Sequence, residues 1–455
     1  MDASFNTVPA AALVWLNTIL SERLSTRLLL TQSDPEYLLI SLPGSENSVR
    51  IKSDYARFSQ AHSDLPCHHW DATSEGWQSA LNLPLPTPGV QHAPSPLIEK
   101  TTTGCTIHYD ILGLVYWMLT RQEEAGRNDL DSHGRFPATA SHAYKHGYLE
   151  RPVADEWLAI LAQAVQRTWP QLPLNQHTFS VIPTHDVDTP ARYGFLSFKQ
   201  LLRAMAGDVV RRRKPVDAIK APAIWLRSKK QLHAHDPFNT FNWIMDISEQ
   251  NAITSAFYFI CGRTEPSLDA LYNPEHPAIR ELMRRIHARG HEIGLHPSYN
   301  TYKKPEAIVS EARTLINICQ EEGITQSRWG GRMHYLRWQT PTTLYGWEQA
   351  GMSYDSTLSY ADRPGFRCGT CHEYPAFDPI THKPLHLRIR PLIAMECTVM
   401  APRYMDLGTG EIALNKFIQL KAACRAVQGN FTLLWHNTLL EQPQERDLYK
   451  SVLLG

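Results

Sequence analysis

The sequence has no excess of charge of either sign, because 45 lysines and arginines stand against 45 aspartates and glutamates in 455 residues. Proteins that bind nucleic acids carry a broad positive field, so we expect no nucleic-acid partner. The sequence also lacks an uncharged apolar run of about 18 residues, the shortest that spans a bilayer. We therefore predict a globular chain with no membrane span.

Targeting and disulfide signals are also missing. Polar residues interrupt the segment 11–20, and Ser21-Glu22-Arg23 follows directly, so the N-terminus does not resemble a secretory signal. The eight cysteines are scattered through a long chain, which favours reduced thiols over a disulfide framework. Both observations predict a cytoplasmic location.

Core-forming residues are plentiful: 43% of the chain is hydrophobic, with 12 tryptophans, 18 tyrosines and 14 phenylalanines. Residues 1–174 mix helical patterns with polar loops, and apolar residues at helical spacing predict helices over 109–124 and 154–168. This part shows no constellation of reactive groups. We predict a mixed α/β N-terminal accessory domain over 1–174, whose role the sequence does not indicate.

After Pro173 the pattern changes to short β-rich runs that alternate with helical stretches. Helices are predicted between several of the runs, over 278–289, 305–322, 341–350 and 412–427. Such alternation predicts a parallel sheet or barrel, and we expect an α/β barrel of about seven strands over 175–455. The seven runs are Phe179–Asp188, Thr254–Ile260, His291–Ser298, Arg328–Tyr335, Met352–Ser359, Leu387–Met400 and Asn430–Asn437.

Polar side chains gather at the carboxyl ends of four of these runs. They are Asp186 and Asp188 in the first, His296 and Asn300 in the third, Arg332, His334 and Tyr335 in the fourth, and His436 in the seventh. In α/β barrels the carboxyl ends of the strands converge on one mouth, where reactive groups lie. We therefore expect carboxylates, imidazoles and an arginine to share one rim.

The two aspartates of the first run predict a cation site. Asp186 and Asp188 leave the same face of an extended segment, so they repel each other unless a cation or a proton intervenes. With His296 as a nitrogen ligand and Asn300 as an oxygen ligand, the site would suit zinc, cobalt, nickel, manganese or iron. The alternative is that these groups only cap strands and bond the loop backbone.

Four motifs together resemble a known family. Thr-His-Asp-Val-Asp (184–188), Gly-His-Glu-Ile-Gly-Leu-His (290–296), the Arg332 loop and Leu-Leu-Trp-His (433–436) follow one another as in the polysaccharide deacetylase superfamily, or carbohydrate esterase family four. The resemblance runs from about Phe179 to the C-terminus and implies a distorted (β/α)7 barrel. It is strongest with a bacterial branch in which a distinct N-terminal domain precedes the barrel.

The resemblance implies roles for individual residues. Asp186 corresponds to the general base and Asp188 to the metal-binding aspartate, with Val187 between them as in the Asp-Xaa-Asp members. His296 matches the first metal-binding histidine. Asn300 stands where the second histidine belongs, and an amide oxygen is a poorer zinc ligand, so His291 or His334 is an alternative that completes the site.

Other residues receive roles around the substrate. Arg332 resembles the arginine that orients the base, and His436 resembles the histidine that protonates the leaving amine. The residues expected to bind substrate are His334, Tyr335, Asp355 and Arg367.

The resulting hypothesis is a metal-dependent hydrolase, zinc being the first choice of metal, that removes an N-acetyl or related acyl group from a sugar. Its substrate would be a small molecule or oligosaccharide, such as a cytoplasmic precursor of a surface polysaccharide. Two alternatives stay open. One is a catalytically silent barrel that binds a glycan or a partner protein, and the other is an amidase that cleaves a non-carbohydrate C–N bond.

Two further motifs have competing interpretations. Cys368-Gly-Thr-Cys371-His372 has the spacing of a haem attachment site or a redox dithiol, but its place after the fifth run favours a loop that shapes the substrate mouth. Arg211-Arg-Arg-Lys214 is typical of a solvated helix end, with a site for an anionic ligand as the alternative.

Overall fold

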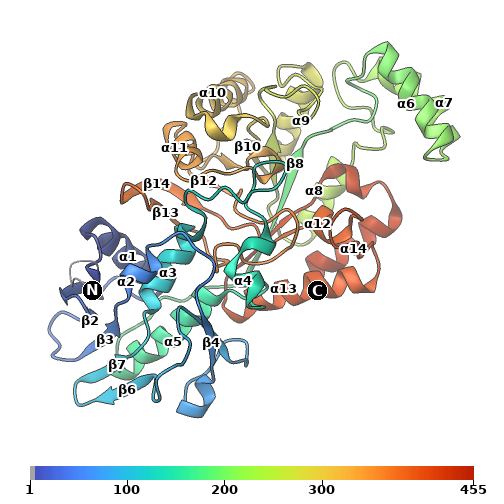
Figure 1. Cartoon of the computed structure of the whole chain (residues 1–455). Helices are drawn as coiled ribbons and strands as arrows, with labels where there is room; N and C mark the ends of the chain where they lie inside the picture. Colours follow the sequence, from blue (N-terminus) through green and yellow to red (C-terminus); the bar gives the residue numbers. More distant parts are fainter. Residues whose placement is uncertain (1–5) are drawn as a thin grey trace.

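A computed structural model of the chain describes residues 6–455 (Figure 1). The structure is mixed α/β, as predicted, with one sheet built from residues 29–107 and a larger one from residues 180–434. None of the helices between residues 6 and 455 combines the length and the apolar character needed to cross a bilayer.

Between residues 6 and 174 there are seven short strands: β1 (Leu29–Asp34), β2 (Tyr37–Ser41), β3 (Ser48–Lys52), β4 (Cys67–Trp70), β5 (Leu85–Pro88), β6 (Ile98–Thr101) and β7 (Gly104–Ile107). Five of them form a sheet in the order β1-β2-β3-β7-β6, in which only β3 and β7 are parallel. Strands β4 and β5 form a separate antiparallel pair. Alternating burial along β2 and β3 shows that one face of the sheet covers a core.

The helices of this part are α1 (Ala10–Arg23), α2 (Tyr55–Phe58), α3 (Ile111–Leu119), α4 (His142–Lys145) and α5 (Val153–Thr168). The two predicted helices are present as α3 and α5, which pack against each other. Helix α3 ends earlier than predicted, because Arg121 adopts a φ of +55° and a separate 3-10 turn follows it. Asp110 begins α3 by accepting the backbone N–H of Gly113 at 2.7 Å.

The second sheet has nine strands: β8 (Ser180–Val187), β9 (Ala256–Phe259), β10 (Glu292–Leu295), β11 (Gly330–Gly331), β12 (Tyr354–Asp355), β13 (Tyr374–Asp378), β14 (Lys383–Ile389), β15 (Ala394–Met395) and β16 (Asn430–Leu434). Their order is β13-β14-β12-β11-β10-β9-β8-β16-β15. All neighbours are parallel except β13 and β14, which form an antiparallel hairpin. The predicted parallel sheet is therefore confirmed.

The sixth predicted run differs from the structure. Leu387–Met400 is not one strand but the end of β14, the short β15 and the helix α12 (Glu396–Met400). Pro391 separates the two strands because it has no N–H to donate to a ladder. The pairing among residues 6–455 runs as a row with β13 and β15 at its ends, so closure into a seven-stranded barrel stays a prediction.

Helices alternate with the strands of this sheet: α6 (Phe198–Val210), α7 (Pro215–Arg227), α8 (Phe241–Gln250), α9 (Pro277–Ala288), α10 (Pro305–Glu321), α11 (Thr342–Gln349), α13 (Glu411–Ala426) and α14 (Pro443–Leu454). Helices α9, α10, α11 and α13 match the predicted helices to within two residues at each end. Most of them cover the sheet, whereas α6 and α7 form a hairpin that projects from the body of the molecule (Figure 1).

The two parts of the chain pack against each other through α1 and the β13–β14 hairpin. The indole of Trp15 donates to the backbone oxygen of Pro375 at 2.9 Å, and its ring lies 5.3 Å from that of Phe377. At the rim of this contact, Arg388 forms an ion pair with Glu22 at 2.9 Å. The N-terminal part is therefore docked on the edge of the large sheet.

Candidate active site

A pocket of about 140 Å³ lies at the carboxyl ends of the large sheet's strands. Its lining consists of Arg135, Asp186, Asp188, His296, His334, Tyr335, Leu336, Met395, Cys397, Arg403, Tyr404, Leu434 and His436. Six of these residues are among those that the sequence predicts for one rim. The parallel register explains their convergence, because neighbouring strands end at the same edge.

Asp186 is held by a buried arginine. Nη1 of Arg332 donates to Oδ1 of Asp186 at 2.8 Å, and both side chains are almost completely buried. The other guanidinium nitrogens of Arg332 donate to the backbone oxygen of Ser356 and to Oγ1 of Thr184, both at 2.9 Å. This fork fixes the position and the rotamer of the carboxylate.

Glycine in β11 brings the arginine to this position. A Cβ atom on Gly331 would lie 1.8 Å from the backbone oxygen of Leu295, so only glycine allows β11 to approach β10 so closely. The next residue, Arg332, donates its N–H to the same oxygen at 3.0 Å. The close pairing of β10 and β11 therefore points the Arg332 side chain toward the end of β8.

Three potential metal ligands lie beside Asp186. Oδ1 of Asp188 is 3.2 Å from Nε2 of His296 and 3.7 Å from Nε2 of His334, and one ligand atom from each lies within 4.8 Å of the others. Asp188 follows β8, His296 follows β10 and His334 follows β11. Two imidazoles and a carboxylate are a common zinc donor set.

The hydrogen bonds of the two imidazoles fit metal binding. Nδ1 of His296 lies 2.6 Å from the backbone oxygen of Arg332, and since a carbonyl only accepts, Nδ1 carries the proton. Nδ1 of His334 similarly lies 3.1 Å from Oδ1 of Asp269. In both rings Nε2 is left to face Asp188, the arrangement in which an outer acceptor orients a ligating histidine.

The environment of Asp188 also indicates a cation site. Its Oδ1 is buried and accepts no hydrogen bond within the described part of the chain, despite the nearby ring nitrogens. Burial opposes ionisation, but His334, His296 and His436 together lower the pKa of Asp188 far below its usual range. An ionised carboxylate with an unpaired oxygen between two Nε2 atoms fits a divalent metal ion.

Asn300 requires a correction, because the structure does not bring it to the ligand group. Its Nδ2 donates to the backbone oxygen of Thr264 at 3.2 Å, and its Oδ1 accepts from Arg337 at 3.1 Å. His334 stands at the third position instead, which was the alternative. His291, the other alternative, lies before β10 and accepts the N–H of Ser255.

His436 is paired with a carboxylate that the sequence did not indicate. Its Nδ1 lies 2.5 Å from Oε1 of Glu396, the first residue of α12, and its Nε2 lies 3.5 Å from Oδ2 of Asp188. Burial lowers the pKa of His436, but Glu396 and the two aspartates overcome this and raise it to about 10. The only sequence signal for Glu396 is an acidic residue inside an apolar run.

The expected substrate-binding residues divide into two groups. His334 and Tyr335 line the pocket, whereas Asp355 and Arg367 do not. Asp355 is buried and accepts from the N–H and Oγ1 of Thr357. Arg367 is corrected from a substrate contact to a structural residue, because it is buried in an ion pair with Glu124.

The N-terminal part contributes Arg135 to the pocket, although no reactive group was expected from it. Nη1 of Arg135 donates to the backbone oxygen of Tyr335 at 2.9 Å, and Nε donates to Oδ2 of Asp131 at 2.8 Å. Tyr335 and Leu336 adopt φ angles of +61° and +55°, which are strained for residues with side chains. Arg135 therefore braces the turn that carries His334.

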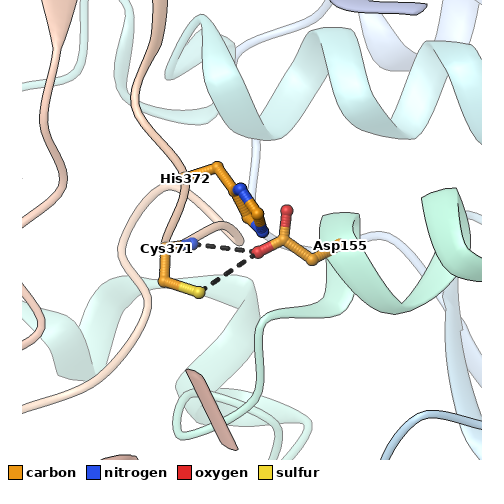
Figure 2. Close-up of side chains that lie close together, drawn as sticks. All are labelled: Asp155, Cys371 and His372. Carbon is orange, nitrogen blue, oxygen red and sulfur yellow. Dashed lines mark hydrogen bonds between the residues drawn. The ribbon is translucent and has the colours of Figure 1, made fainter. Parts of the chain in front are cut away.

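A second group of polar side chains lies away from the pocket, where α5 meets the loop before β13 (Figure 2). Oδ2 of Asp155 accepts from the N–H of Cys371 at 2.9 Å, and Oδ1 pairs with Arg23 at 2.7 Å. His372 lies beside them, with Nε2 3.0 Å from the backbone oxygen of Val427. Because Arg23 already neutralises the carboxylate, the group is a polar contact between the two parts of the chain.

The thiols of the Cys368–Cys371 motif are buried in this loop. Burial raises the pKa of both Cys368 and Cys371 above its ordinary value, and only a thiolate is a good nucleophile. This environment disfavours the redox-dithiol interpretation.

Comparisons with known proteins give distant similarities. Residues 11–170 match the model of a family of unknown function, DUF7033. No curated protein matches the chain significantly.

Among solved structures, a protein described as a polysaccharide deacetylase from Mycobacterium smegmatis is 17% identical, with 61% of this chain and 84% of that chain covered and a TM-score of 0.39. PuuE allantoinase is 13% identical, with coverages of 63% and 88% and a TM-score of 0.35. A protein described as a polysaccharide deacetylase from Pseudomonas aeruginosa PAO1 is also 13% identical, with coverages of 61% and 83% and a TM-score of 0.35.

Proposed function

We propose that this chain is a metal-dependent hydrolase of amide C–N bonds that removes an N-acetyl or related acyl group from a sugar. The observation that carries the proposal is the pocket itself. It combines a carboxylate held by Arg332, a carboxylate–imidazole ligand group and an imidazole held by Glu396. Arg332 fixes the carboxylate of Asp186, and Glu396 raises the pKa of His436, so one site holds a candidate base and a candidate acid.

Zinc bound by Asp188, His296 and His334 would supply Lewis acidity toward the acyl carbonyl and its attacking water. Asp186 takes a proton from that water, since its carboxylate is held by Arg332 and lines the pocket. His436 then gives its Nε2 proton to the departing nitrogen, and the C–N bond breaks to leave a carboxylate and an amine. Glu396 keeps His436 protonated before the transfer.

The substrate and the organisation of the chain are part of the same proposal. The resemblance of the four motifs to polysaccharide deacetylases supports a sugar amide, and we place it among precursors of a surface polysaccharide in the cytoplasm. The family match over 11–170 supports a division near residue 174 into an accessory domain and a catalytic part. The contact of Arg135 with Tyr335 supports a role for that accessory domain in shaping the pocket.

The test compares metal content with activity. The purified chain is stripped with a chelator, reloaded with zinc or cobalt, and assayed on N-acetylated amino sugars and on cyclic ureides and imides. We expect deacetylation of the sugars that is lost on stripping, returns with metal and is absent in Asp188→Ala. A chain that binds no metal at roughly millimolar concentration, where binding is worth only about 4 kcal/mol, would be a silent binding module instead. Turnover of ureides or imides alone would identify the non-carbohydrate amidase.

A further inference from the structure

The hairpin of α6 and α7 has no evident role in the site, yet its surface is unusual. It follows β8, the strand that carries Asp186, and it stands clear of the body of the molecule (Figure 1). Its two helices pack through a small core of Leu201, Ala221 and Ile224, to which Tyr193 of the preceding segment also belongs. The hairpin is therefore a discrete element that contacts the rest of the described chain mainly at its base, and its outer faces are exposed.

Each helix carries an exposed apolar stripe. On α6 the stripe consists of Phe198, Leu202 and Val209, and on α7 of Val216, Ile219 and Leu226. The spacings of three, four and seven residues place each set on one helical face. Phe198 is 63% exposed and Ile219 is 78% exposed, although burial of such side chains is what normally stabilises a helix in a protein. Exposed apolar stripes of this kind mark an interaction surface.

The same hairpin carries a strong positive charge in a chain whose net charge is zero. Residues 198–230 contain ten lysines and arginines against two aspartates, and no glutamate. Arg212 and Lys214 pair with Glu441, at the base of the hairpin. The others form no ion pair with any carboxylate of residues 6–455: Lys199, Arg203, Arg211, Arg213, Lys220, Arg227, Lys229 and Lys230.

We propose that the α6–α7 hairpin docks on an anionic lipid surface, lying in the interface without crossing it. Amphipathic helices with bulky apolar residues on one face and lysines and arginines beside them bind such surfaces by inserting the apolar face among the headgroups. The positive charges add attraction to anionic lipids. Charge complementarity selects this occupant over a second copy of the chain, because a second hairpin would bring the same positive charge to the contact. It also selects a lipid over a nucleic acid, which would leave the aliphatic stripes exposed.

The docking has a consequence for the proposed hydrolase. The hairpin and Asp188 follow the same strand, so both lie on the chain segment that leaves the carboxyl end of β8. A docked hairpin would hold the enzyme at a membrane surface where lipid-linked substrates reside. The docking does not depend on catalysis, however, and it is tested separately from it.

The experiment measures co-sedimentation of the full chain with vesicles of phosphatidylcholine alone and of phosphatidylcholine with about one third phosphatidylglycerol. We expect binding to the anionic vesicles that weakens with salt. Lys220→Gln with Arg227→Gln should weaken it about 25-fold, because each charge near such a surface contributes roughly fivefold. Ile219→Ser with Leu226→Ser should weaken it at least about tenfold through lost apolar burial.

Matched controls change exposed residues elsewhere. Lys304→Gln with Arg313→Gln is the charge control, and Val14→Ser with Ile412→Ser is the apolar control, since both side chains are more than half exposed. The controls should bind vesicles like the wild type, and circular dichroism should show an unchanged helix content in every variant. Turnover of a small water-soluble acyl sugar should also be unchanged, so that loss of docking is distinguished from loss of catalysis.

Several results would overturn the proposal. The proposal fails if the wild type does not bind anionic vesicles at about 0.15 M salt. It also fails if the wild type binds neutral vesicles as well as it binds anionic ones. If the control variants lose as much vesicle binding as the hairpin variants, the hairpin is not the site that binds the membrane. The proposal would also fail if the wild type formed a dimer and bound no vesicles, and if the Ile219→Ser, Leu226→Ser double variant were a monomer. The apolar surface would then be a contact between two copies of the chain.

Discussion

The carboxylate of Glu396 accepts two hydrogen bonds from one residue, His436, through Oε1: from the backbone N–H at 3.0 Å and from Nδ1 at 2.5 Å. This double contact fixes the position and the orientation of the ring, so Nε2 faces the pocket and Asp188. Because Glu396 holds His436, the proposed general acid, it should affect the rate of the reaction without contacting the substrate.

We predict that Glu396→Gln lowers kcat about 10- to 100-fold and leaves KM almost unchanged, as expected for loss of an orienting partner. Removing the negative charge lowers the pKa of His436, so the alkaline limb of the pH–rate profile should move to lower pH. The measurement is kcat and KM on an N-acetylated sugar from pH 6 to 10. Glu441→Gln, which removes a carboxylate outside the pocket, is the control. If the alkaline limb does not move in Glu396→Gln, Glu396 does not set the pKa of the catalytic acid.

Asp186→Asn should keep the fold and the metal while deacetylation falls at least about 100-fold, because the amide cannot take a proton from water. Asparagine still offers Oδ1 to Arg332, so the buried guanidinium keeps its partner. Zinc content by metal analysis and turnover of the same sample are the two readouts. Full turnover in the metal-loaded variant would remove Asp186 from the role of base.

The ligand set is tested by comparing His334 with Asn300. His334→Ala should weaken zinc binding at least about 100-fold, since it removes one of three ligands. Asn300→Ala should leave zinc binding within about threefold, because that side chain is engaged with Thr264 and Arg337. Calorimetric titration with zinc measures both, and the reverse order of effects would restore Asn300 as the ligand.

Much of the framework could be predicted from the sequence because it depends on local pattern. The alternation of apolar runs and amphipathic helices predicts the parallel sheet, and β8, β10 and β16 begin or end within two residues of three predicted runs. The polar residues at the strand ends then meet because parallel strands end at one edge. This is why Asp186, His296 and His436 line one pocket.

What could not be predicted depends on contacts between distant segments. Spacing within one motif favoured Asn300 as a ligand, but the backbone after β10 turns its side chain toward Arg337, and His334 arrives from another strand. Glu396 was hidden in a run that Pro391 breaks, and no periodicity marks that break. Arg135 comes from the other part of the chain, and only the packing of the two parts brings it to the pocket.

Arg135 offers a test of that packing. Arg135→Ala should weaken zinc binding several-fold and lower activity without unfolding the chain, because the strained turn at Tyr335 and Leu336 loses the donor that braces it. The readouts are zinc affinity by calorimetry and the urea midpoint of unfolding. Arg151→Ala, which breaks an ion pair with Glu156 inside the N-terminal part, is the control. Zinc affinity equal to that of the wild type in Arg135→Ala would show that the turn needs no brace.

The last prediction concerns Asp355 and the pH dependence of stability. Burial raises the pKa of Asp355 to about 7, although Thr357 and nearby arginines oppose the rise. In the unfolded chain an aspartate titrates near 3.9. The folded pKa is therefore the higher one, so the stability due to this group is fully present below about pH 4 and is lost as the pH rises to about 7. Above pH 7 its contribution is constant.

Between those limits each pH unit should remove at most about 1.4 kcal/mol of unfolding free energy through this group. Asp355→Asn abolishes the titration, and its Oδ1 can still accept the hydrogen bond from Oγ1 of Thr357. The measurement is urea unfolding of the wild type, Asp355→Asn and the exposed control Asp447→Asn at pH 5 and pH 8. The wild type and the control should lose more stability between these two pH values than Asp355→Asn does. Equal losses in all three would show that the buried carboxyl group is already ionised at pH 5.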